Sequence, residues 1–321
     1  MKILVTGTAG FIGFHLARAL LDDGHEVVGY DNFNDYYSVQ LKRDRHAILE
    51  KRPGYCGTEA DLCDRETLQR VFRERKIELV CHLAAQAGVR YSLKNPFAYQ
   101  RSNLEGFLNV LEACRQNSVS RLVYASSSSV YGGNTRLPFS ESDPVDTPIS
   151  LYAATKKSNE LMAHAYSHLY GLQAVGLRFF TVYGPWGRPD MAIWIFAKAM
   201  VEGRPIQVFN HGRMRRDFTY VDDILAGVKG ALFAEKLSKH EIFNLGNHRS
   251  EGLLDMIGIL ADAIGAKPVL EMADMQDGDI PETFADIEKA RSKLGFAPLT
   301  TIREGIPRFV DWFCEYHHIA R

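Results

Sequence analysis

The chain has 321 residues, of which 46% are hydrophobic and 24% charged, and its formal net charge at pH 7 is −1. This length exceeds that of most single domains and predicts two lobes or one large domain with an appendage. The near-zero charge excludes a global basic field that would hold nucleic acid or an anionic membrane. Any anionic ligand must therefore be held by locally placed basic groups and helix N-termini.

The five cysteines include no Cys-x-x-Cys pair, which argues against a disulfide framework and a structural zinc site and is typical of a reducing cytoplasm. No apolar run reaches transmembrane length, and a β-strand pattern begins at Lys2 in place of a charged-then-apolar leader. We therefore expect a cytoplasmic protein without a metal, nucleic-acid or membrane partner.

Short apolar runs rich in β-branched residues alternate with amphipathic stretches up to Phe180. Apolar strands separated by helices predict a parallel sheet covered on both faces, which is a doubly wound α/β fold. The predicted strands are Lys2–Thr6, Glu26–Asp31, Leu79–Leu83, Arg121–Ser126 and Gln173–Phe180, and the predicted helices are Phe11–Asp22, Glu66–Arg75, Phe97–Gln116 and Ser150–Tyr170.

The alternation ends at Thr181–Asp190, a segment rich in Gly, Pro and aromatic residues that predicts a loop. We expect a smaller α/β lobe over 181–213 and 246–321, while 214–245 rejoins the domain formed by 1–180. The predicted elements of this half are helices over Met191–Glu202, Asp222–Phe233, Glu251–Ile264 and Ile287–Leu294, and strands over Ile206–Phe209 and Arg216–Val221.

A glycine-rich turn, GTAGFIG, joins the first predicted strand to the first predicted helix. Gly7 permits the tight turn, Gly10 lets the backbone approach a pyrophosphate, and Gly13 allows close packing of helix on strand. The helix N-terminus offers unpaired N–H groups and a positive dipole to phosphates. The second strand ends at Asp31, where a carboxylate accepts hydrogen bonds from an adenosine ribose and repels a 2′-phosphate. The pattern predicts dinucleotide binding, with NAD favoured over NADP.

The spacing GxxGxxG, in place of GxGxxG, resembles that of the short-chain dehydrogenase/reductase superfamily, and further matches cover nearly the whole chain. Asp61-Leu62 resembles the adenine-contacting pair, the segment HLAA at 82–85 resembles the strand end along the cofactor, and Asn103 matches the helix asparagine. The resemblance implies a Rossmann domain whose NAD contacts are Gly7, Gly10, Phe11, Ile12, Gly13, Asp31, Asn32, Asp61, Leu62, Leu83, Ala84, Ala85, Asn103, Tyr152 and Lys156.

Tyr152 and Lys156 form a YxxxK pair, and a spacing of four residues puts both side chains on one helix face. Of the 14 tyrosines, only Tyr152 has a lysine at this spacing. A nearby ammonium and the positive ring of an oxidised nicotinamide would lower the pKa of the phenol and make it a base for a hydroxyl proton. In the resembling superfamily, a hydroxyl in an S-S-x-x-V-Y-G segment completes the catalytic set, and Ser127 holds that position.

The two residues after Ser127 bear on the reaction. Nucleotide-sugar 4,6-dehydratases of this superfamily carry Asp-Glu there, to deprotonate C5 and expel water from C6. This chain has Ser128 and Ser129, whose hydroxyls cannot act as such an acid or base at neutral pH. Dehydration is therefore disfavoured.

The segment Arg178–Met191 resembles the substrate loop of UDP-glucuronate 4-epimerases, as do the stretches Tyr30–Tyr37 and Met275–Pro281. Galactose-type 4-epimerases usually have asparagine at the position of Thr181 and lack the Arg-Pro-Asp-Met run that begins at Arg188. A guanidinium there would bind a sugar C6 carboxylate through two hydrogen bonds.

The resemblance also implies contacts to the UDP moiety. Arg216 matches an arginine that holds the pyrophosphate, with Arg213 and Arg215 as lesser candidates, and Asp279 matches an acid near the nucleotide ribose. Phe209 is a candidate neighbour of uracil, although an apolar residue at the end of a strand is as often part of the core. The predicted substrate contacts are Ser128, Ser129, Thr181, Arg188, Phe209, Arg216 and Asp279.

The implied reaction is reversible C4 epimerisation of UDP-glucuronate to UDP-galacturonate through a transient 4-keto sugar. Hydride is transferred from C4 to NAD and then back to the opposite face of C4. Because the intermediate is a β-keto acid that tends to lose carbon dioxide, an epimerase must clamp the carboxylate. UDP-glucose/UDP-galactose 4-epimerase, UDP-glucuronate decarboxylase and a catalytically silent NAD-binding regulator remain as alternatives. The predicted clamp residues are Arg188, Thr181, Ser128 and Ser129.

The pair His164 and His168 lies four residues apart on one predicted helix, but no glutamate completes an HExxH motif, so no metal site is predicted. The helices Phe97–Gln116 and Ser150–Tyr170 have apolar faces that form a dimer bundle in the resembling family. We therefore expect a homodimer whose other partner is the UDP-sugar.

Overall fold

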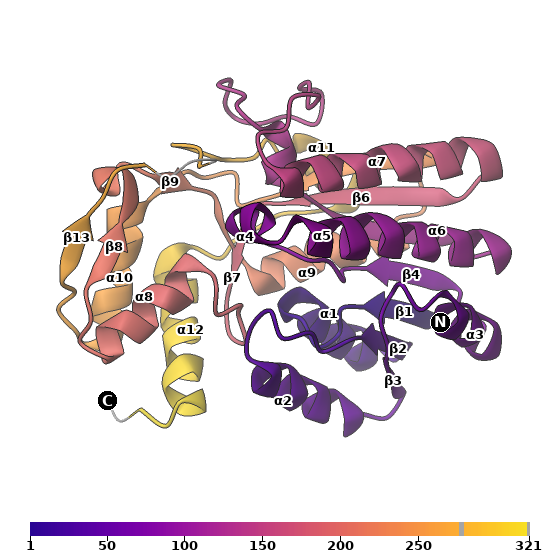
Figure 1. The fold of residues 1–321 in the computed structure, drawn as a ribbon, viewed down its shortest axis with the longest axis horizontal. Helices are drawn as coiled ribbons and strands as arrows, with labels where there is room; N and C mark the ends of the chain where they lie inside the picture. Colours follow the sequence, from indigo (N-terminus) through magenta and orange to yellow (C-terminus); the bar gives the residue numbers. More distant parts are fainter. Residues whose placement is uncertain (276–278, 320–321) are drawn as a thin grey trace.

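The computed structural model describes residues 1–275 and 279–319, and a seven-stranded parallel sheet forms its centre (Figure 1). The strand order, β11-β6-β5-β4-β1-β2-β3, confirms the predicted doubly wound Rossmann arrangement, with the order reversing between β1 and β4. The strands are β1 (Lys2–Thr6), β2 (Glu26–Asp31), β3 (Tyr55–Glu59), β4 (Leu79–His82), β5 (Arg121–Ser127), β6 (Gln173–Phe179) and β11 (His240–Leu245).

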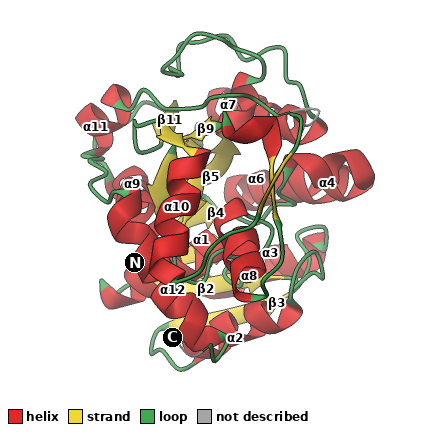
Figure 2. Ribbon diagram, turned by 90° about the vertical axis from the view of Figure 1, so that its left-hand side faces the viewer, coloured by secondary structure: helices red, strands yellow, loops and turns green. Residues whose placement is uncertain are grey.

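Helices cover both faces of this sheet (Figure 2). Burial on both faces explains why the central strands consist almost entirely of apolar residues. One face is covered by α3 (Arg65–Arg75), α6 (Gly106–Gln116) and α7 (Leu151–Tyr170), and the other by α1 (Phe11–Asp22), α2 (Val39–Glu50), α9 (Val221–Phe233) and α11 (Glu288–Leu294).

The ends of α7 are set by its own sequence. The Ser150 hydroxyl accepts a hydrogen bond from the N–H of Ala153, and the helix ends where Gly171 takes a left-handed conformation with φ of 73°. Tyr152 therefore lies in the first helical turn, at the end of the helix nearest the carboxyl ends of the strands.

The predicted helix over Phe97–Gln116 is confirmed, although its first half is not purely α-helical. The structure has α5 (Pro96–Tyr99), a π-helical segment over Gln100–Glu105 and then α6, and a further helix, α4 (Val89–Lys94), precedes them. Asn95 ends α4 and caps α5 through its side chain, with Pro96 in the first turn, so the chain restarts at this point. Periodicity alone did not reveal this restart or the π-helical segment.

A smaller C-terminal lobe lies at the left of Figure 1. It confirms the predicted second lobe, but its strands are shorter than expected: the strand predicted over Arg216–Val221 is two short strands, and the predicted loop Thr181–Asp190 begins with one. The short strands of this half pair as β7 (Thr181–Tyr183) with β10 (Phe218–Tyr220), β9 (Arg215–Arg216) with β12 (Glu251–Gly252) and β8 (Ile206–Val208) with β13 (Leu270–Met272), so that β9 and β10 of the returning segment 214–245 pair with strands of the lobe. The helices of the lobe are α8 (Ala192–Val201), α10 (Leu253–Ile264) and α12 (Ile302–Tyr316).

An aromatic cluster joins the loop at 184–190 to this lobe. The ring of Trp186 lies 5.2 Å from that of Trp312 and 5.3 Å from that of Tyr316, both on α12. Trp194 of α8 lies 5.3 Å from Trp312, so the three tryptophans of the chain share one cluster. The cluster packs the loop against α12.

Within the described residues, no helix has the length and apolar character needed to cross a membrane. Over the same residues, no group of three or more His, Cys, Asp and Glu side chains is arranged to hold a metal ion.

Candidate active site

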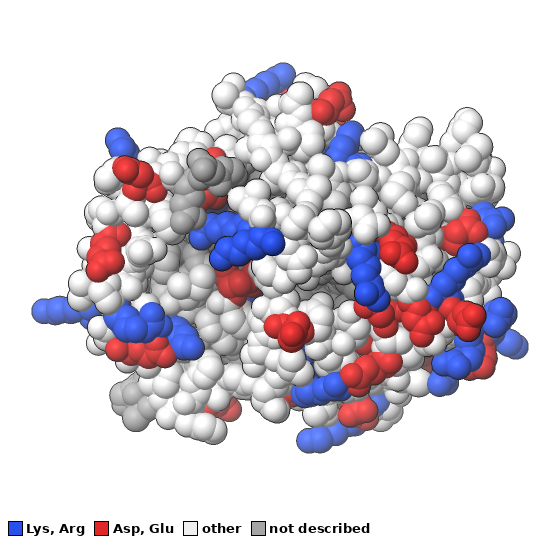
Figure 3. Space-filling model, viewed as in Figure 1, with Lys and Arg blue, Asp and Glu red and all other residues white. Residues whose placement is uncertain are grey.

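A cavity of about 1300 Å³ lies at the carboxyl ends of the parallel strands, between the sheet and the C-terminal lobe. Figure 3 shows this hollow, with basic side chains gathered along its edge. All but one of the predicted site residues line it: Gly7, Gly10, Phe11, Ile12, Gly13, Asp31, Asn32, Asp61, Leu62, Leu83, Ala84, Ala85, Ser127, Ser128, Ser129, Tyr152, Lys156, Thr181, Arg188, Phe209, Arg216 and Asp279.

The glycine turn forms one wall at the switch point between β1 and β4. Gly7 has φ of +77°, and a Cβ added to it would lie 2.8 Å from the backbone nitrogen of Ala84. A Cβ on Gly13 would lie 2.0 Å from the carbonyl oxygen of Gly7. Gly10 begins α1 without a side-chain cap, so the first N–H groups of the helix are left for an anion. This cradle fits the pyrophosphate of a dinucleotide.

Two carboxylates at the ends of β2 and β3 complete the cofactor side. Asp31 accepts hydrogen bonds from the N–H groups of Ala9 (3.0 Å) and Phe33 (2.9 Å), and burial raises its pKa. The Asp61 carboxylate accepts a hydrogen bond from Asn32 at 3.1 Å. An acceptor at the end of β2 suits a ribose with free hydroxyls and repels a 2′-phosphate, so the residues fit NAD.

Asn103 is the exception among the predicted cofactor contacts. Its side chain is buried in the π-helical segment, where it accepts from the N–H of Gln86 at 2.8 Å and donates to the Gln86 carbonyl and to Thr155, each at 3.0 Å. The side-chain amide of Asn103 is therefore hydrogen-bonded to other residues of the chain, and it holds Gln86, which lines the cavity, in place. Asn103 therefore supports the wall and does not line it.

The catalytic set comes from two neighbouring elements. Ser127 ends β5, Tyr152 lies in the first turn of α7, and Lys156 lies one turn further. The Lys156 ammonium is buried and donates to the carbonyl of Ala125 at 2.8 Å, and burial lowers its pKa to about 8. The Ser127 hydroxyl accepts from the N–H of Ser129 at 3.2 Å, which fixes its orientation. The structure thus brings the predicted set to one cavity.

The pKa of Tyr152 differs from the expectation that Lys156 lowers it. Burial dominates and raises the pKa of the phenol, against a hydrogen bond from Ser127 and the positive charge of Arg188, while Asp190 raises it further. Among the charged groups of the chain, Arg188 lowers the pKa of the phenol, while the Lys156 ammonium donates to the carbonyl of Ala125.

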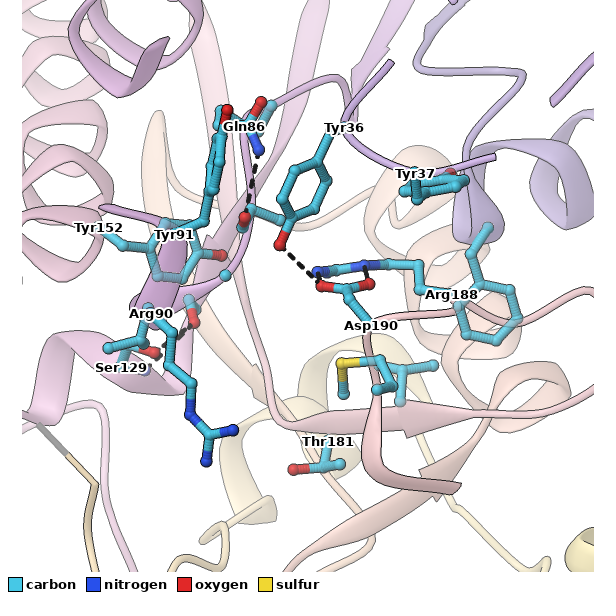
Figure 4. A pocket seen from close by; sticks show the side chains of 18 of the residues that line it. Tyr36, Tyr37, Gln86, Arg90, Tyr91, Ser129, Tyr152, Thr181, Arg188 and Asp190 are labelled. Carbon is cyan, nitrogen blue, oxygen red and sulfur yellow. Dashed lines mark hydrogen bonds and ion pairs between the residues drawn. The ribbon is translucent and has the colours of Figure 1, made fainter. Parts of the chain in front are cut away.

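Arg188, which is predicted to bind the sugar carboxylate, is paired with a carboxylate of the chain itself. Its Nε donates to Asp190 at 3.0 Å, its Nη2 donates to the other oxygen of the same carboxylate, and Tyr36 donates to Asp190 at 3.0 Å. Figure 4 shows this trio at the cavity, with Thr181 and Ser129 on other sides of it. Asp190 lies within the segment that resembles the epimerase substrate loop, but its pairing with Arg188 was not predicted.

The outer part of the cavity holds a second group that the sequence only partly predicts. Asp279 lies 3.9 Å from the Arg216 guanidinium and 3.3 Å from that of Arg90, which stands 5.0 Å over the ring of Phe209. Arg90 was not predicted, because a single arginine in a short helix carries no pattern. Of the recognised stretch Met275–Pro281, residues 276–278 lie outside the described residues.

A family model described as the NAD dependent epimerase/dehydratase family matches residues 3–246. The chain belongs to this family. A probable UDP-glucuronate 4-epimerase of Rhizobium meliloti is 46% identical, over 100% of this chain and 99% of its own length. Protein CapI of Staphylococcus aureus is 48% identical over 99% of both chains. A UDP-glucuronic acid 4-epimerase from Bacillus cereus, solved with UDP-glucuronic acid and NAD, has a TM-score of 0.93 at 35% identity and covers 98% of this chain and 100% of that one.

Membership in this NAD-dependent family confirms the predicted cofactor and the prediction of an enzyme of the nucleotide-sugar epimerase type. The whole chain takes part in the likeness, so the C-terminal lobe is shared with these relatives as well as the Rossmann sheet.

Proposed function

We propose that the protein interconverts UDP-glucuronate and UDP-galacturonate by inverting C4. The observation that carries the proposal is the lining of the cavity, where Ser127, Ser128, Ser129 and Thr181 offer hydroxyl groups and the two dehydratase positions hold serines in place of carboxylic acids. Relatives named UDP-glucuronate 4-epimerases at 46% and 48% identity support the same substrate.

The residues of the chain have distinct tasks in this reaction. Tyr152, as phenolate, takes the proton of O4, and Ser127 bridges the phenol and the sugar hydroxyl. NAD, when bound on the glycine turn, supplies the acceptor and donor of the C4 hydride. Lys156 holds the strand end through the Ala125 carbonyl and adds positive charge beneath the cofactor side of the site.

The carboxylate clamp is broader than one arginine. Since Asp190 neutralises much of the charge of Arg188, the hydroxyls of Ser128, Ser129 and Thr181 share the task of holding the C6 carboxylate. When the carboxylate is held there, the C5–C6 bond stays out of alignment with the π system of the C4 carbonyl, and the sugar does not lose carbon dioxide.

The outer group holds the UDP moiety in this proposal. Arg216 and Arg90 bind the pyrophosphate, Phe209 lies against the uracil, and Asp279 faces the ribose. With UDP fixed at the mouth of the cavity, the sugar is free to rotate about its link to the pyrophosphate. This rotation is needed because hydride leaves one face of C4 and returns to the other.

Incubation of the purified protein with UDP-glucuronate, UDP-glucose or UDP-xylose, with products resolved by NMR, tests the proposal. We expect UDP-galacturonate without pentose, and a loss of turnover of roughly 10²- to 10⁴-fold in Tyr152→Phe. Turnover of UDP-glucose alone would favour the hexose epimerase. This second candidate is supported by the similar protein MoeE5, which was solved both with UDP-glucuronic acid and with UDP-glucose. A pentose as the main product would indicate a decarboxylase. A lack of turnover with every sugar would indicate a catalytically silent NAD-binding regulator.

We further propose a homodimer formed through α6 and α7. Their outer faces expose Leu108, Leu161 and Leu169, the last two with 59% and 66% of their surface accessible. Sedimentation of Leu161→Glu, expected as a monomer, against the wild-type dimer tests this.

We propose that residues 1–180 and 214–245 form the cofactor domain, and that residues 181–213 and 246–321 form the substrate lobe. Five free thiols agree with the cytoplasm as the place of the reaction.

A further inference from the structure

Two buried side chains hold the loop that precedes Arg188. Residues 185–187 present three consecutive carbonyl groups to side chains of α1 and α2. His15 Nε2 lies 2.8 Å from the first carbonyl oxygen, and Arg45 Nη2 donates to the second and third at 2.6 Å and 2.9 Å. Because a carbonyl only accepts, His15 Nε2 carries the proton, and burial lowers the pKa of this imidazole to about 4, which keeps it neutral.

The other side of the Arg45 guanidinium faces the glycine turn. Its Nη1 donates to the carbonyl of Ala9 at 2.8 Å and to the hydroxyl of Tyr37 at 2.9 Å. Ala9 stands between Gly7 and Gly10. Arg45 itself has no accessible surface. One buried side chain thus contacts both the cofactor turn and the substrate loop.

The chemistry of this contact is specific to arginine. The four oxygens that accept from Arg45 are neutral, so the buried charge is kept by hydrogen bonds in two directions. A planar guanidinium reaches both directions at once, whereas an ammonium is a point charge with one centre. A residue that only filled space here would not need a charge.

The loop also needs an external hold. Trp186 has φ of +57°, in the left-handed region that side chains other than glycine rarely adopt. Such a conformation persists where surrounding contacts enforce it. Two and four residues later, Arg188 and Asp190 line the cavity.

We propose that Arg45 is a positioning residue that couples the glycine turn to the substrate loop, so that Arg188 is placed correctly only while the turn has its cofactor-binding conformation. His15 supports the same loop from α1. The choice of ligand in the first test below rests on the proposed function, and the second test does not.

The first test compares Arg45→Lys and His15→Phe, which keeps the ring contacts of His15, with the surface control Arg52→Met. Calorimetry gives the Kd of UDP and of UDP-glucuronate for the NAD-loaded proteins. We expect UDP-glucuronate to bind roughly tenfold more weakly to both variants, as for the loss of one hydrogen bond to a charged group, with UDP binding unchanged. Adding Arg188→Met to Arg45→Lys should cost no more than Arg188→Met alone, because both act at one place.

The second test is hydrogen–deuterium exchange of residues 181–190 with and without added NAD. NAD should slow exchange about fivefold or more in the wild type and in Arg52→Met, and much less in Arg45→Lys and His15→Phe. An unchanged NAD response in both variants overturns the inference, as does an equal loss of UDP and UDP-glucuronate binding. If the wild type does not prefer UDP-glucuronate to UDP, the proposed function fails, and the exchange result alone decides on Arg45.

Discussion

Glu160 and Arg178 form a doubly hydrogen-bonded ion pair in the core, with Arg178 Nε and Nη2 donating to the carboxylate at 2.8 Å and 2.9 Å. Ser126, directly before Ser127, donates to the same carboxylate at 2.7 Å. The pair therefore ties α7, which carries Tyr152, to β5 and β6. The two elements that carry the catalytic set, β5 and α7, therefore meet β6 at one buried carboxylate.

Breaking this pair should destabilise the fold strongly. Glu160→Gln leaves the Arg178 charge buried without its partner, so we expect the free energy of unfolding to fall by about 3–5 kcal/mol in urea denaturation. Glu112→Gln, which breaks the surface pair with Arg115, should cost about 0–1 kcal/mol. A Glu160→Gln loss as small as that of the surface control would contradict this account.

The clamp predicts a change in product. Arg188→Ala leaves Asp190 as an unpaired negative charge beside the site of the sugar carboxylate, so UDP-glucuronate should bind more weakly and a larger share should leave as pentose. The pentose-to-galacturonate ratio, measured by NMR, checks this against Lys198→Ala on the outer face of α8. Normal binding with no pentose would show that Arg188 is not part of the clamp.

The pH dependence of turnover should depend on Asp190. Arg188 lowers the pKa of Tyr152 and Asp190 raises it, so Asp190→Asn should lower that pKa. Because the phenolate is the active form, the rate rises with pH through this pKa, and the acidic limb of the kcat profile should move to lower pH. Tyr36→Phe removes a hydrogen bond to Asp190 but no charge and should leave the limb in place. A limb that stays put in Asp190→Asn refutes the assignment.

The glycine turn gives a matched pair of alanine substitutions. A Cβ on Gly13 would meet the Gly7 carbonyl at 2.0 Å, so Gly13→Ala should lose NAD and stability together. Gly258, within α10, has open space at the same position, so Gly258→Ala should stabilise the protein by roughly 0.5–1 kcal/mol. NAD content after desalting and thermal melting measure both effects; retention of NAD by Gly13→Ala would contradict the cradle.

Local patterns predicted five of the seven strands of the sheet, the glycine turn and the Tyr152–Lys156 pair, because each depends on neighbours in the sequence, but they did not predict β3 and β11. Ser127 was assigned through the family resemblance. α2 was missed, since its polar sequence hides the buried Arg45 and Leu41. The bonds from Tyr36 to Asp190, from Arg90 to Asp279 and from Arg45 to Trp186 join residues that lie far apart along the chain, so they form only once the loop, the turn and the lobe are folded together.

The aromatic cluster around Trp186 has a practical consequence. All three tryptophans sit where the substrate loop meets α8 and α12, so the intrinsic fluorescence of the unlabelled protein comes from a single locality. Tryptophan fluorescence therefore serves as an intrinsic probe of the surroundings of that loop. Stopped-flow mixing with a UDP-sugar would follow loop movement in real time without any added dye.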